Sequence, residues 1–383
     1  YSSLELGGLT IKPSTLLFEK DLHEISTSYQ KEGNEVLLMD EDYFDPLAAS
    51  FFFVSRYEEH LKSSLDNHNR YSASSSHLHK LGILNTPIVN IWALDLLTKI
   101  QSTYPDITAL PRKFDFLSTI DIDQAWKYKY KGFLRTQGAI IRDILDVDKN
   151  QLAERRQVLK GQIADPFDNF EMHQKWHDEF NTAVQYFIQV GRRGKFDKNQ
   201  SAKHPPFQKL IRRLDQYQEV SIHPSYQSNE SIAIVKDEIN TLEKILNRTV
   251  TKSRQHFLMH RMPQTYHNLI ELGMKEDYTL GYSTHLGFRA GIAAPFYFYD
   301  FIKEKKTDLR IIPFCVMDIT PMHYMNLNLD QAIETVLTQI DAVKQVGGMY
   351  CSLWHNESLS DSGRWKGWRP LYKEILSACS QSS

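Results

Sequence analysis

The sequence has few cysteines, no large excess of either charge and no long apolar run, and each shortage excludes a class of protein. Three cysteines in 383 residues are too few and too scattered for a disulfide framework or a thiolate zinc cluster. Lys and Arg number 45 against 47 Asp and Glu, whereas nucleic-acid-binding domains are usually strongly basic. No apolar stretch approaches the ~18 residues that a membrane-spanning helix needs. We therefore expect a soluble globular protein with no nucleic-acid partner and no membrane span.

Composition and length set limits on how the chain is organised. Apolar residues make up 41% of the chain and aromatic residues 12%, which is enough for a packed core. The length suggests two domains, or one large domain with an attachment. The sequence begins at Tyr1 without a charged-then-apolar leader. This favours a cytoplasmic location, while a periplasmic or secreted one stays open if the sequence is trimmed at its start. No pattern indicates an oligomeric state.

Two regions of the chain differ in texture. Residues 1–105 are irregular, with short apolar runs and two predicted helices, Pro46–Lys62 and Ile88–Ile100. A linker containing two prolines follows, and helices seldom continue through the residue before a proline. We place the boundary there, which predicts an uncharacterised N-terminal domain over residues 1–105 and a larger domain over residues 112–383.

In the larger region, short strand-like runs alternate with longer amphipathic segments. Strands are predicted at Phe116–Ile122, Val184–Val190, Val220–Ile222, Thr249–Leu258, Tyr278–Tyr282, Arg310–Met317 and Met349–Trp354. Helices are predicted at Pro206–Tyr217, Ser231–Leu246, Pro263–Leu272 and Leu329–Val346. Such alternation implies parallel strands joined by right-handed crossovers, hence a barrel-like or doubly wound α/β domain. Residues 125–183 are more than one crossover needs, so we predict a helical insertion after the first strand.

Reactive groups of α/β barrels collect at the carboxyl ends of the strands, and the first predicted strand ends in two carboxylates. Asp121 and Asp123 are two residues apart, so their side chains point to the same side of the strand. Two close carboxylates need a cation or hydrogen-bond donors nearby, or one of them has a raised pKa. The alternative interpretation is a turn in which the aspartates cap the next helix.

Three more polar residues stand in or directly after later strands. His223 follows the third strand, Arg254 lies in the fourth and His355 ends the last. A histidine in such a place can be a metal ligand or an acid–base group, although a single histidine is more often structural. The functional interpretation therefore depends on these side chains meeting at one rim of the barrel.

From residue 115 to about residue 377, the order of these motifs resembles that of the NodB-homology polysaccharide deacetylases, carbohydrate esterase family 4. The matching residues are Asp121 and Asp123 in the first motif, His223 in the histidine motif, Arg254 in the third, Asp277 in the fourth and His355 in the closing Leu-x-His. A bacterial subgroup also has motifs like Leu47–Phe52, Ser55–Glu59 and Val316–Asp318. The resemblance implies an α/β fold, a distorted (β/α) barrel of the NodB type with a small N-terminal α/β domain.

The resemblance also implies a hydrolase that removes N-acetyl or O-acetyl groups from a glycan or amino sugar with a divalent metal, zinc being the expected one. Such a metal polarises the carbonyl and lowers the pKa of a bound water. The implied roles are general base for Asp121, metal ligand for Asp123 and His223, partner of the base for Arg254, general acid for His355 and charge-keeping partner of that acid for Asp277.

One position departs from the family pattern. The family has a second metal-binding histidine four residues after the first, and here that residue is Gln227, whose amide is a poorer ligand for zinc than imidazole. Gln227, His256 or water could complete the site, or the metal is absent. Two alternative functions therefore stay open: a carbohydrate-binding homologue with weakened catalysis, and a non-sugar hydrolase of cyclic amides.

Two further groups of charged residues have an ordinary and a functional interpretation. Residues 192–213 contain eight Lys and Arg against one Asp. We interpret them as a solvated face, with a rim for anionic sugars as the alternative. Arg289 is predicted to form a structural ion pair, and holding a substrate anion is its alternative role.

Overall fold

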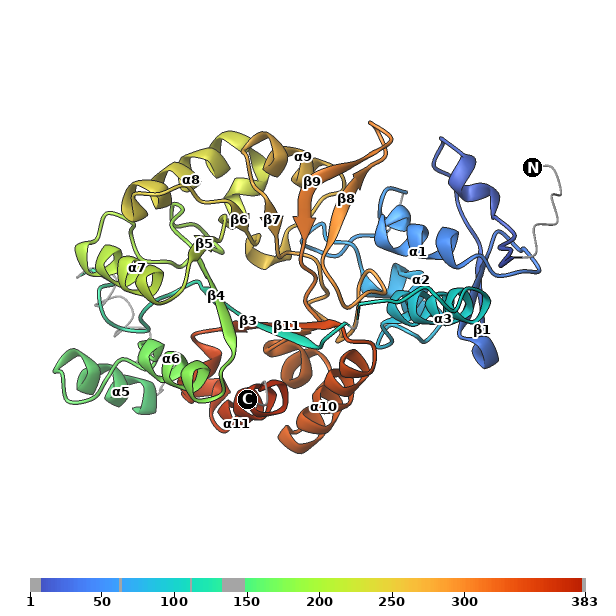
Figure 1. Cartoon of the computed structure of the whole chain (residues 1–383). Helices are drawn as coiled ribbons and strands as arrows, with labels where there is room; N and C mark the ends of the chain where they lie inside the picture. Colours follow the sequence, from blue (N-terminus) through green and yellow to red (C-terminus); the bar gives the residue numbers. More distant parts are fainter. Residues whose placement is uncertain (1–7, 62–63, 111, 133–148, 381–383) are drawn as a thin grey trace.

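The structure of the chain, a computed structural model, describes residues 8–61, 64–110, 112–132 and 149–380. Its centre is a curled nine-stranded sheet in the order β10-β11-β3-β4-β5-β6-β7-β9-β8, with helices around the outside of the curl (Figure 1). The strands are β3 (Asp115–Ile122), β4 (Ala183–Ile188), β5 (Val220–Ile222), β6 (Lys252–Ser253), β7 (Glu276–Asp277), β8 (Phe296–Asp300), β9 (Lys305–Ile311), β10 (Val316–Met317) and β11 (Met349–His355). The predicted distorted (β/α) barrel is confirmed.

Parallel pairing of the strands brings the carboxyl-terminal residues to one rim. All neighbouring strands of this sheet are parallel except β8 and β9, which form an antiparallel hairpin. Since parallel strands run in one direction, the residues that follow them emerge at the same edge. β11 lies beside β3 in a register that pairs His355 with Asp121. Two predicted site residues are thus neighbours although they are far apart in the chain.

The helices cover the sheet with apolar faces. They are α5 (Lys149–Leu159), α6 (Phe170–Glu179), α7 (Pro205–Tyr217), α8 (Ile232–Leu246), α9 (Gln264–Glu271), α10 (Leu329–Gln345) and α11 (Arg369–Cys379). The side-chain oxygen of Ser231 accepts a hydrogen bond at the start of α8, and Asn328 forms a capping box with Gln331 at the start of α10. Amphipathic spacing and capping signals were both readable in the sequence, and the four predicted helices agree within one residue.

The segment after β3 and the short strands show where the prediction was less complete. The insertion carries α5 and α6, while its residues 133–148 lie outside the described residues. The strand predicted over Thr249–Leu258 is reduced to β6 and followed by the turn η6 (His256–Leu258). The run Tyr278–Tyr282 lies after β7 rather than within a strand. Buried loops have the same apolar pattern as buried strands, so periodicity alone does not separate them.

Residues 8–105 form an α/β layer with its own apolar core. Its elements are β1 (Thr27–Gln30), β2 (Glu35–Leu38), α1 (Pro46–Val54), α2 (His77–Lys80) and α3 (Ile88–Thr103). α1 is shorter than the predicted helix Pro46–Lys62, because Arg56 has a φ of 57° and the chain turns there. The division into domains at residues 105 and 112 stays a prediction.

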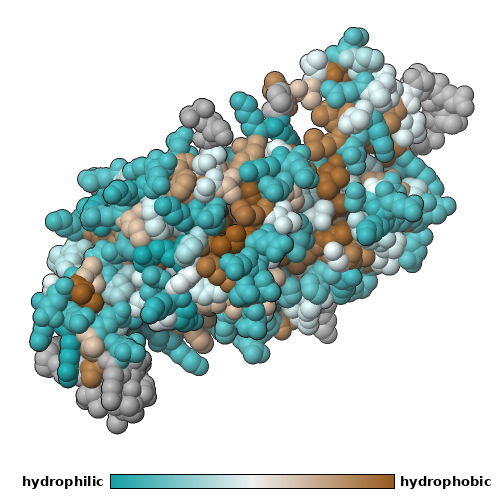
Figure 2. Space-filling view, turned by 90° about the horizontal axis from the view of Figure 1, so that it is seen from below, coloured by the Kyte–Doolittle hydropathy of each residue, from teal (hydrophilic) through white to brown (hydrophobic). Residues whose placement is uncertain are grey.

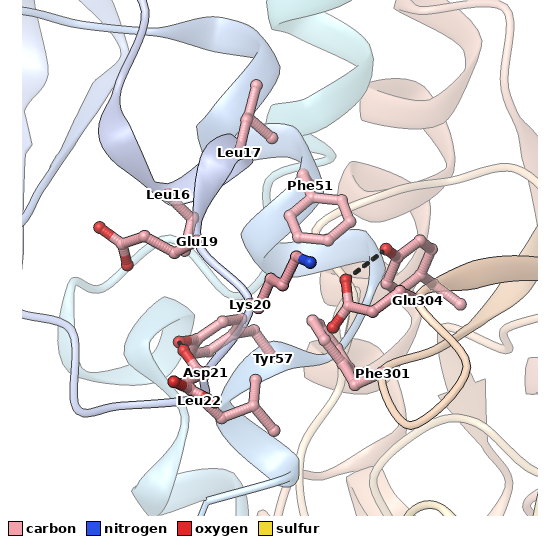
Figure 3. Close-up of a pocket in the computed structure, with 11 residues that line it drawn as sticks. Leu16, Leu17, Glu19, Lys20, Asp21, Leu22, Phe51, Tyr57, Phe301 and Glu304 are labelled. Atoms are coloured by element: carbon pink, nitrogen blue, oxygen red, sulfur yellow. Dashed lines mark hydrogen bonds between the residues drawn. The ribbon is translucent and has the colours of Figure 1, made fainter.

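The N-terminal region packs against the β8–β9 hairpin (Figure 1). Its Phe51 ring lies 5.1 Å from the ring of Tyr299, and Tyr57 lies 5.4 Å from Phe301. Figure 3 shows these side chains around a cavity of about 100 Å³, with Glu304 accepting a hydrogen bond from the hydroxyl of Tyr299 at 3.2 Å. Aromatic edge contacts of this kind add to the free energy of burial. The hairpin is therefore one of the surfaces on which the N-terminal region is anchored.

A buried ion pair joins the N-terminal region to the barrel. Arg289 Nη2 lies 2.6 Å from Glu59 Oε2, and Arg56 Nη2 lies 2.7 Å from Glu59 Oε1. Burial works against an ionised Glu59, but the two guanidinium groups hold the pKa of this carboxyl well below its usual range. The predicted structural ion pair of Arg289 is thus present. Separating two such buried partners would leave charges without compensation, so the pair disfavours undocking of the N-terminal region.

Figure 2 shows one face on which hydrophilic residues predominate and hydrophobic residues gather in a band near the middle. Among the described residues, none of the helices combines the length and the apolar character that crossing a membrane requires.

The buried imidazole of His260 predicts a pH dependence of stability. Burial and the nearby Arg289 lower the pKa of His260 to about 3, and neither ring nitrogen has a hydrogen-bond partner among the described residues. The unfolded chain takes up this proton near the ordinary pKa of about 6.5. Below that pH the unfolded state therefore binds the additional proton, and the free energy of unfolding falls by about 1.4 kcal/mol per pH unit for this group.

A His260→Phe variant keeps the ring that packs 4.4 Å from Tyr266 and removes the titration. We expect it to lose about 2 kcal/mol less stability than the wild type between pH 7 and pH 5, measured by denaturant unfolding. His323→Phe is the matched control, because solvent already reaches that side chain in the folded protein. Equal losses in wild type and His260→Phe would mean that His260 is not held neutral in the fold.

Candidate functional site

A cavity of about 140 Å³ lies at the carboxyl-terminal rim of the sheet. The ends of β3, β10 and β11 and the segments that follow β5, β6 and β7 contribute to it, together with one arginine of the N-terminal region. Its lining includes Asp121, Asp123, His223, His256, Phe257, Leu258, Ser283, Tyr324, His355 and Arg70. Four of the residues predicted from the sequence therefore meet at this rim.

Three side chains of the cavity form a group that could hold a metal ion. Asp123, His223 and His256 each offer one ligand atom, and these atoms all lie within 4.8 Å of one another. His223 Nε2 is 3.2 Å from Asp123 Oδ1, and both atoms are buried without a hydrogen bond to any described residue. Buried polar atoms without partners are costly. A carboxylate with two imidazoles is a donor set that zinc and similar divalent ions accept, so these residues fit a metal.

Each imidazole of the group is oriented by its other ring nitrogen. His223 Nδ1 lies 2.6 Å from the backbone oxygen of Arg254, and His256 Nδ1 lies 2.8 Å from Asp197 Oδ1. Donation of the Nδ1 proton to these oxygens leaves the Nε2 lone pair of each ring directed toward Asp123. The acceptor of His256 is itself fixed, because Asp197 accepts a hydrogen bond from the backbone N–H of Tyr226 at 2.8 Å.

The charges around His256 and Asp123 are matched to each other. Burial lowers the pKa of His256, but the carboxylates of Asp123 and Asp197 raise it to about 9. Burial likewise disfavours an ionised Asp123, but the charge of His256 brings the pKa of this carboxyl well below its usual range. Without a metal, the His256 ring is therefore protonated on both nitrogens at neutral pH. Metal ions displace such protons from their ligands, so binding here would release one.

Asp121 lies beside the metal-ligand group and is held by a buried arginine. Arg254 Nη1 donates to Asp121 Oδ1 at 3.1 Å and to Thr119 Oγ1 at 2.6 Å. Arg254 Nε donates to the backbone oxygen of Tyr278 at 2.9 Å, and the side chain is 0% exposed. The pairing of Arg254 with Asp121 that the resemblance implied is thus formed. The second oxygen, Asp121 Oδ2, lies 3.7 Å from His223 Nε2.

His355 also lines the cavity, and its partner is Asp318. His355 Nδ1 is 3.0 Å from Asp318 Oδ2, and the backbone N–H of His355 donates to the same oxygen at 2.8 Å. Burial lowers the pKa of His355, but Asp318 and then Asp123 raise it to about 10. The ring is therefore an imidazolium at neutral pH in the absence of a metal, with Nε2 free to face the cavity at 4.0 Å from Asp123 Oδ2.

Asp277 does not take the place that the resemblance implied for it. Its carboxylate accepts hydrogen bonds from Ser253 Oγ at 2.8 Å and from Thr279 Oγ1 at 2.9 Å, and it does not line the cavity. Burial raises its pKa to about 6, against the hydrogen bonds from Thr279 and Ser253. The hydrogen bond from Ser253 joins β6 to β7 at the residue before Arg254. The charge-keeping partner of His355 is Asp318 instead.

Gln227 also lies away from the ligand group. Its side-chain amide packs directly against Gly194, where a Cβ would collide with it, and it is absent from the described lining of the cavity. The place expected for its ligand atom is taken by Nε2 of His256, which comes from the turn after β6. Two consecutive residues of that turn, Phe257 and Leu258, have φ values of 58° and 54°. Such left-handed conformations are rare for bulky residues and mark a backbone held by its surroundings.

Some of the residues at the site had a signal in the sequence and others had none. His256 was noticed as one of several possible completing ligands, and Asp318 was noticed only within a motif of the bacterial subgroup. Asp197 had no signal of its own: it was counted only as the single acidic residue of the basic segment 192–213. Contacts between loops decide all three roles, and the spacing within a single strand or helix does not contain that information.

The assignment of Asp318 predicts a change in the titration of His355. In the metal-free protein, we expect Asp318→Asn to lower the pKa of His355 from about 10 by more than one unit, measured by NMR of the imidazole ring. Asp277→Asn is the matched control, because its carboxylate bonds to Ser253 and Thr279 instead. A larger decrease in Asp277→Asn than in Asp318→Asn would reverse the assignment.

Comparison with known proteins gives distant similarities. Residues 1–105 match a family of unknown function, DUF7033, and no curated protein matches the chain. Among solved structures, the chain is similar to a protein described as a polysaccharide deacetylase from Mycobacterium smegmatis, with 15% identity, a TM-score of 0.45 and coverage of 70% of this chain and 86% of that one. It is also similar to a structure described as Puue allantoinase, with 11% identity, a TM-score of 0.44 and coverage of 71% of this chain and 87% of that one. A protein described as a polysaccharide deacetylase from Pseudomonas aeruginosa PAO1 is similar with 11% identity, a TM-score of 0.42 and coverage of 69% of this chain and 84% of that one.

Proposed function

We propose that this protein is a metal-assisted hydrolase that removes an acetyl group from an amino sugar within a glycan. The observation that carries the proposal is the register of β3 and β11, which pairs Asp121 with His355 at the cavity that Asp123, His223 and His256 also line. A base, an acid and a metal-binding group at one cavity are what amide hydrolysis requires. The motif order that resembles the NodB-homology deacetylases supports acetyl groups of glycans as the substrate.

Asp123, His223 and His256 would hold the metal, zinc being the ion that best suits one carboxylate and two imidazoles. When bound, the metal supplies a Lewis acid that polarises the acetyl carbonyl and acidifies water. The protein contributes a fixed ligand geometry, because the backbone oxygen of Arg254 and the carboxylate of Asp197 orient the two rings.

Asp121 acts as the general base. Its Oδ1 is held by Arg254 and its Oδ2 faces the ligand group, so one oxygen is fixed while the other can take a proton from the attacking water. Arg254 is a positioning residue in this scheme, since its guanidinium is fully buried and reaches the reaction only through Asp121.

His355 acts as the general acid. Its Nδ1 is held by Asp318, so the proton on Nε2 is the one that can be delivered to the leaving nitrogen. Proton transfer to that nitrogen lets the C–N bond break and releases acetate and a free amine. For an O-acetyl substrate the same proton would go to the leaving oxygen. The proposed base and the proposed acid thus come from neighbouring strands, β3 and β11, and line the same cavity as Asp123.

Metal binding is the first test of the proposal. We expect about one zinc per chain by equilibrium dialysis and elemental analysis, with His256→Ala weakening zinc affinity by at least about a hundredfold. Gln227→Ala is the matched control and should keep the metal, because the Gln227 amide lies against Gly194. Retention of zinc by His256→Ala together with its loss from Gln227→Ala would return the ligand role to Gln227.

Catalysis is tested by acetate release from chitooligosaccharides and peptidoglycan fragments. Loss of a general base or acid typically lowers the rate by about 10²–10⁴-fold, so Asp121→Asn and His355→Gln should both lose acetate release while keeping zinc. Lys209→Gln on the exposed face of α7 is the control for unrelated effects. Glycan binding without acetate release in the zinc-loaded wild type would favour a carbohydrate-binding protein instead.

A further inference from the structure

The N-terminal region contributes a wall of the catalytic cavity. Residues Leu65–Tyr71 form a short hairpin closed by an antiparallel bridge between its ends. Asp66 Oδ1 accepts hydrogen bonds from the backbone N–H groups of His68 and Arg70 at 2.8 and 3.0 Å. The hairpin is docked on the barrel, because Arg70 Nη1 donates to the backbone oxygen of Phe257 at 2.8 Å. Phe257 directly follows the proposed metal ligand His256, so the hairpin contacts the residue next to that ligand.

A smaller hollow, which we call the junction hollow, lies beside the catalytic cavity. Its volume is about 50 Å³, and its lining includes Asp66, Tyr71, Ser72 and Thr284. Three residues line both the catalytic cavity and the junction hollow: Arg70, Leu258 and Ser283. A sugar bound with its acetyl group at Asp121 would therefore extend past these three residues to reach the hollow.

Arg70 presents unused hydrogen-bond donors at this passage. Its guanidinium has five N–H donors, of which Nε is bound by Asp66 Oδ2 at 2.7 Å and one N–H of Nη1 by Phe257. Nη2 makes no hydrogen bond with the residues that the structure describes, and the side chain is 13% exposed. The Ser283 hydroxyl likewise has no partner in that part of the chain, while its backbone oxygen is held by Thr320. Arg70 is thus a fixed cation whose outer edge is open.

We propose that Arg70 and Ser283 bind a carboxylate on the sugar next to the one that is deacetylated, so that the substrate is an acidic glycan. A guanidinium edge and a hydroxyl donate to the two oxygens of a carboxylate with matching geometry. The hollow has room for a group of that size. A doubly charged phosphate fits less well, because the neighbouring carboxylate of Asp66 would repel it more strongly.

This inference takes the position of the acetyl-bearing sugar from the proposed function, but its test does not require turnover. The test uses the full chain carrying Asp121→Asn, loaded with zinc, and measures binding by calorimetry. The probes are a hyaluronan tetrasaccharide, in which N-acetylglucosamine alternates with glucuronate, and chitotetraose, which lacks carboxylates. We expect the acidic tetrasaccharide to bind at least about tenfold more tightly, as one hydrogen-bonded carboxylate provides.

Variants in the same background locate the preference. Arg70→Gln should remove it, Arg70→Lys should keep part of it because an ammonium lacks the planar edge, and Ser283→Ala should reduce it by about threefold. Arg193→Gln, on the exposed part of the basic segment, is the matched control and should keep the full preference. If Arg70→Gln does not fold, as judged by circular dichroism, Arg70→Lys and Ser283→Ala decide the question.

The outcomes separate this inference from the proposed function. Equal affinities for the two tetrasaccharides would overturn it, even if the wild type deacetylates chitotetraose. A preference that survives the Arg70 and Ser283 variants but disappears in Arg193→Gln would also overturn it, in favour of the basic segment. A preference that is lost in Arg70→Gln and reduced in Arg70→Lys and Ser283→Ala supports it, and if the wild type then releases no acetate, only the proposed function fails.

Discussion

The site depends on one buried ion pair, between Arg254 and Asp121. Arg254 comes from the residue after β6 and Asp121 from β3, two strands that are separated by β4 and β5 in the sheet. A fully buried guanidinium is costly unless its donors are matched; here Nη1 donates to the Asp121 carboxylate and the Thr119 hydroxyl and Nε to the Tyr278 carbonyl, while Nη2 has no hydrogen-bond partner among the described residues. The ion pair between Arg254 and Asp121 therefore holds β6 and β3 at a fixed distance across the curled sheet. The same arginine orients a proposed metal ligand, because its backbone oxygen accepts a hydrogen bond from His223.

The sequence was sufficient to predict that a residue lies at the site where that residue stands at the end of a strand. Asp121, Asp123, His223 and His355 are each within a residue or two of the end of a regular strand, and parallel pairing necessarily brings such ends together. The sequence was insufficient to predict contacts between side chains that come from different strands and loops. Asp318 directly follows β10 and reaches His355 because β10 is paired with β11, while Asp277 lies in β7, which β3, β4, β5 and β6 separate from β11 in the sheet. Nothing in the spacing of a fourth-motif aspartate could distinguish these two carboxylates.

Gln227 stands where the family pattern has a second histidine, and in the proposed metal site an imidazole from elsewhere takes its place. That imidazole belongs to His256, two residues after Arg254, so the proposed ligand and the arginine that holds Asp121 lie in one short segment. That segment contains two bulky residues in the left-handed region, a conformation that costs of order 1–3 kcal/mol per residue. The surrounding contacts hold it in place: the ring of Phe257 packs against His68, Phe196 and Tyr226.

These contacts also explain why the N-terminal region is part of the site. His68 and Arg70 belong to that region and both contact Phe257, one through its ring and one through its backbone oxygen. The Glu59–Arg289 pair secures the same region to the chain segment that follows β7. Because His256 immediately precedes Phe257, release of the N-terminal region would remove the packing that holds a proposed metal ligand in position. Metal affinity and docking of the N-terminal region are therefore expected to be thermodynamically linked, since anything that binds only the docked state stabilises it.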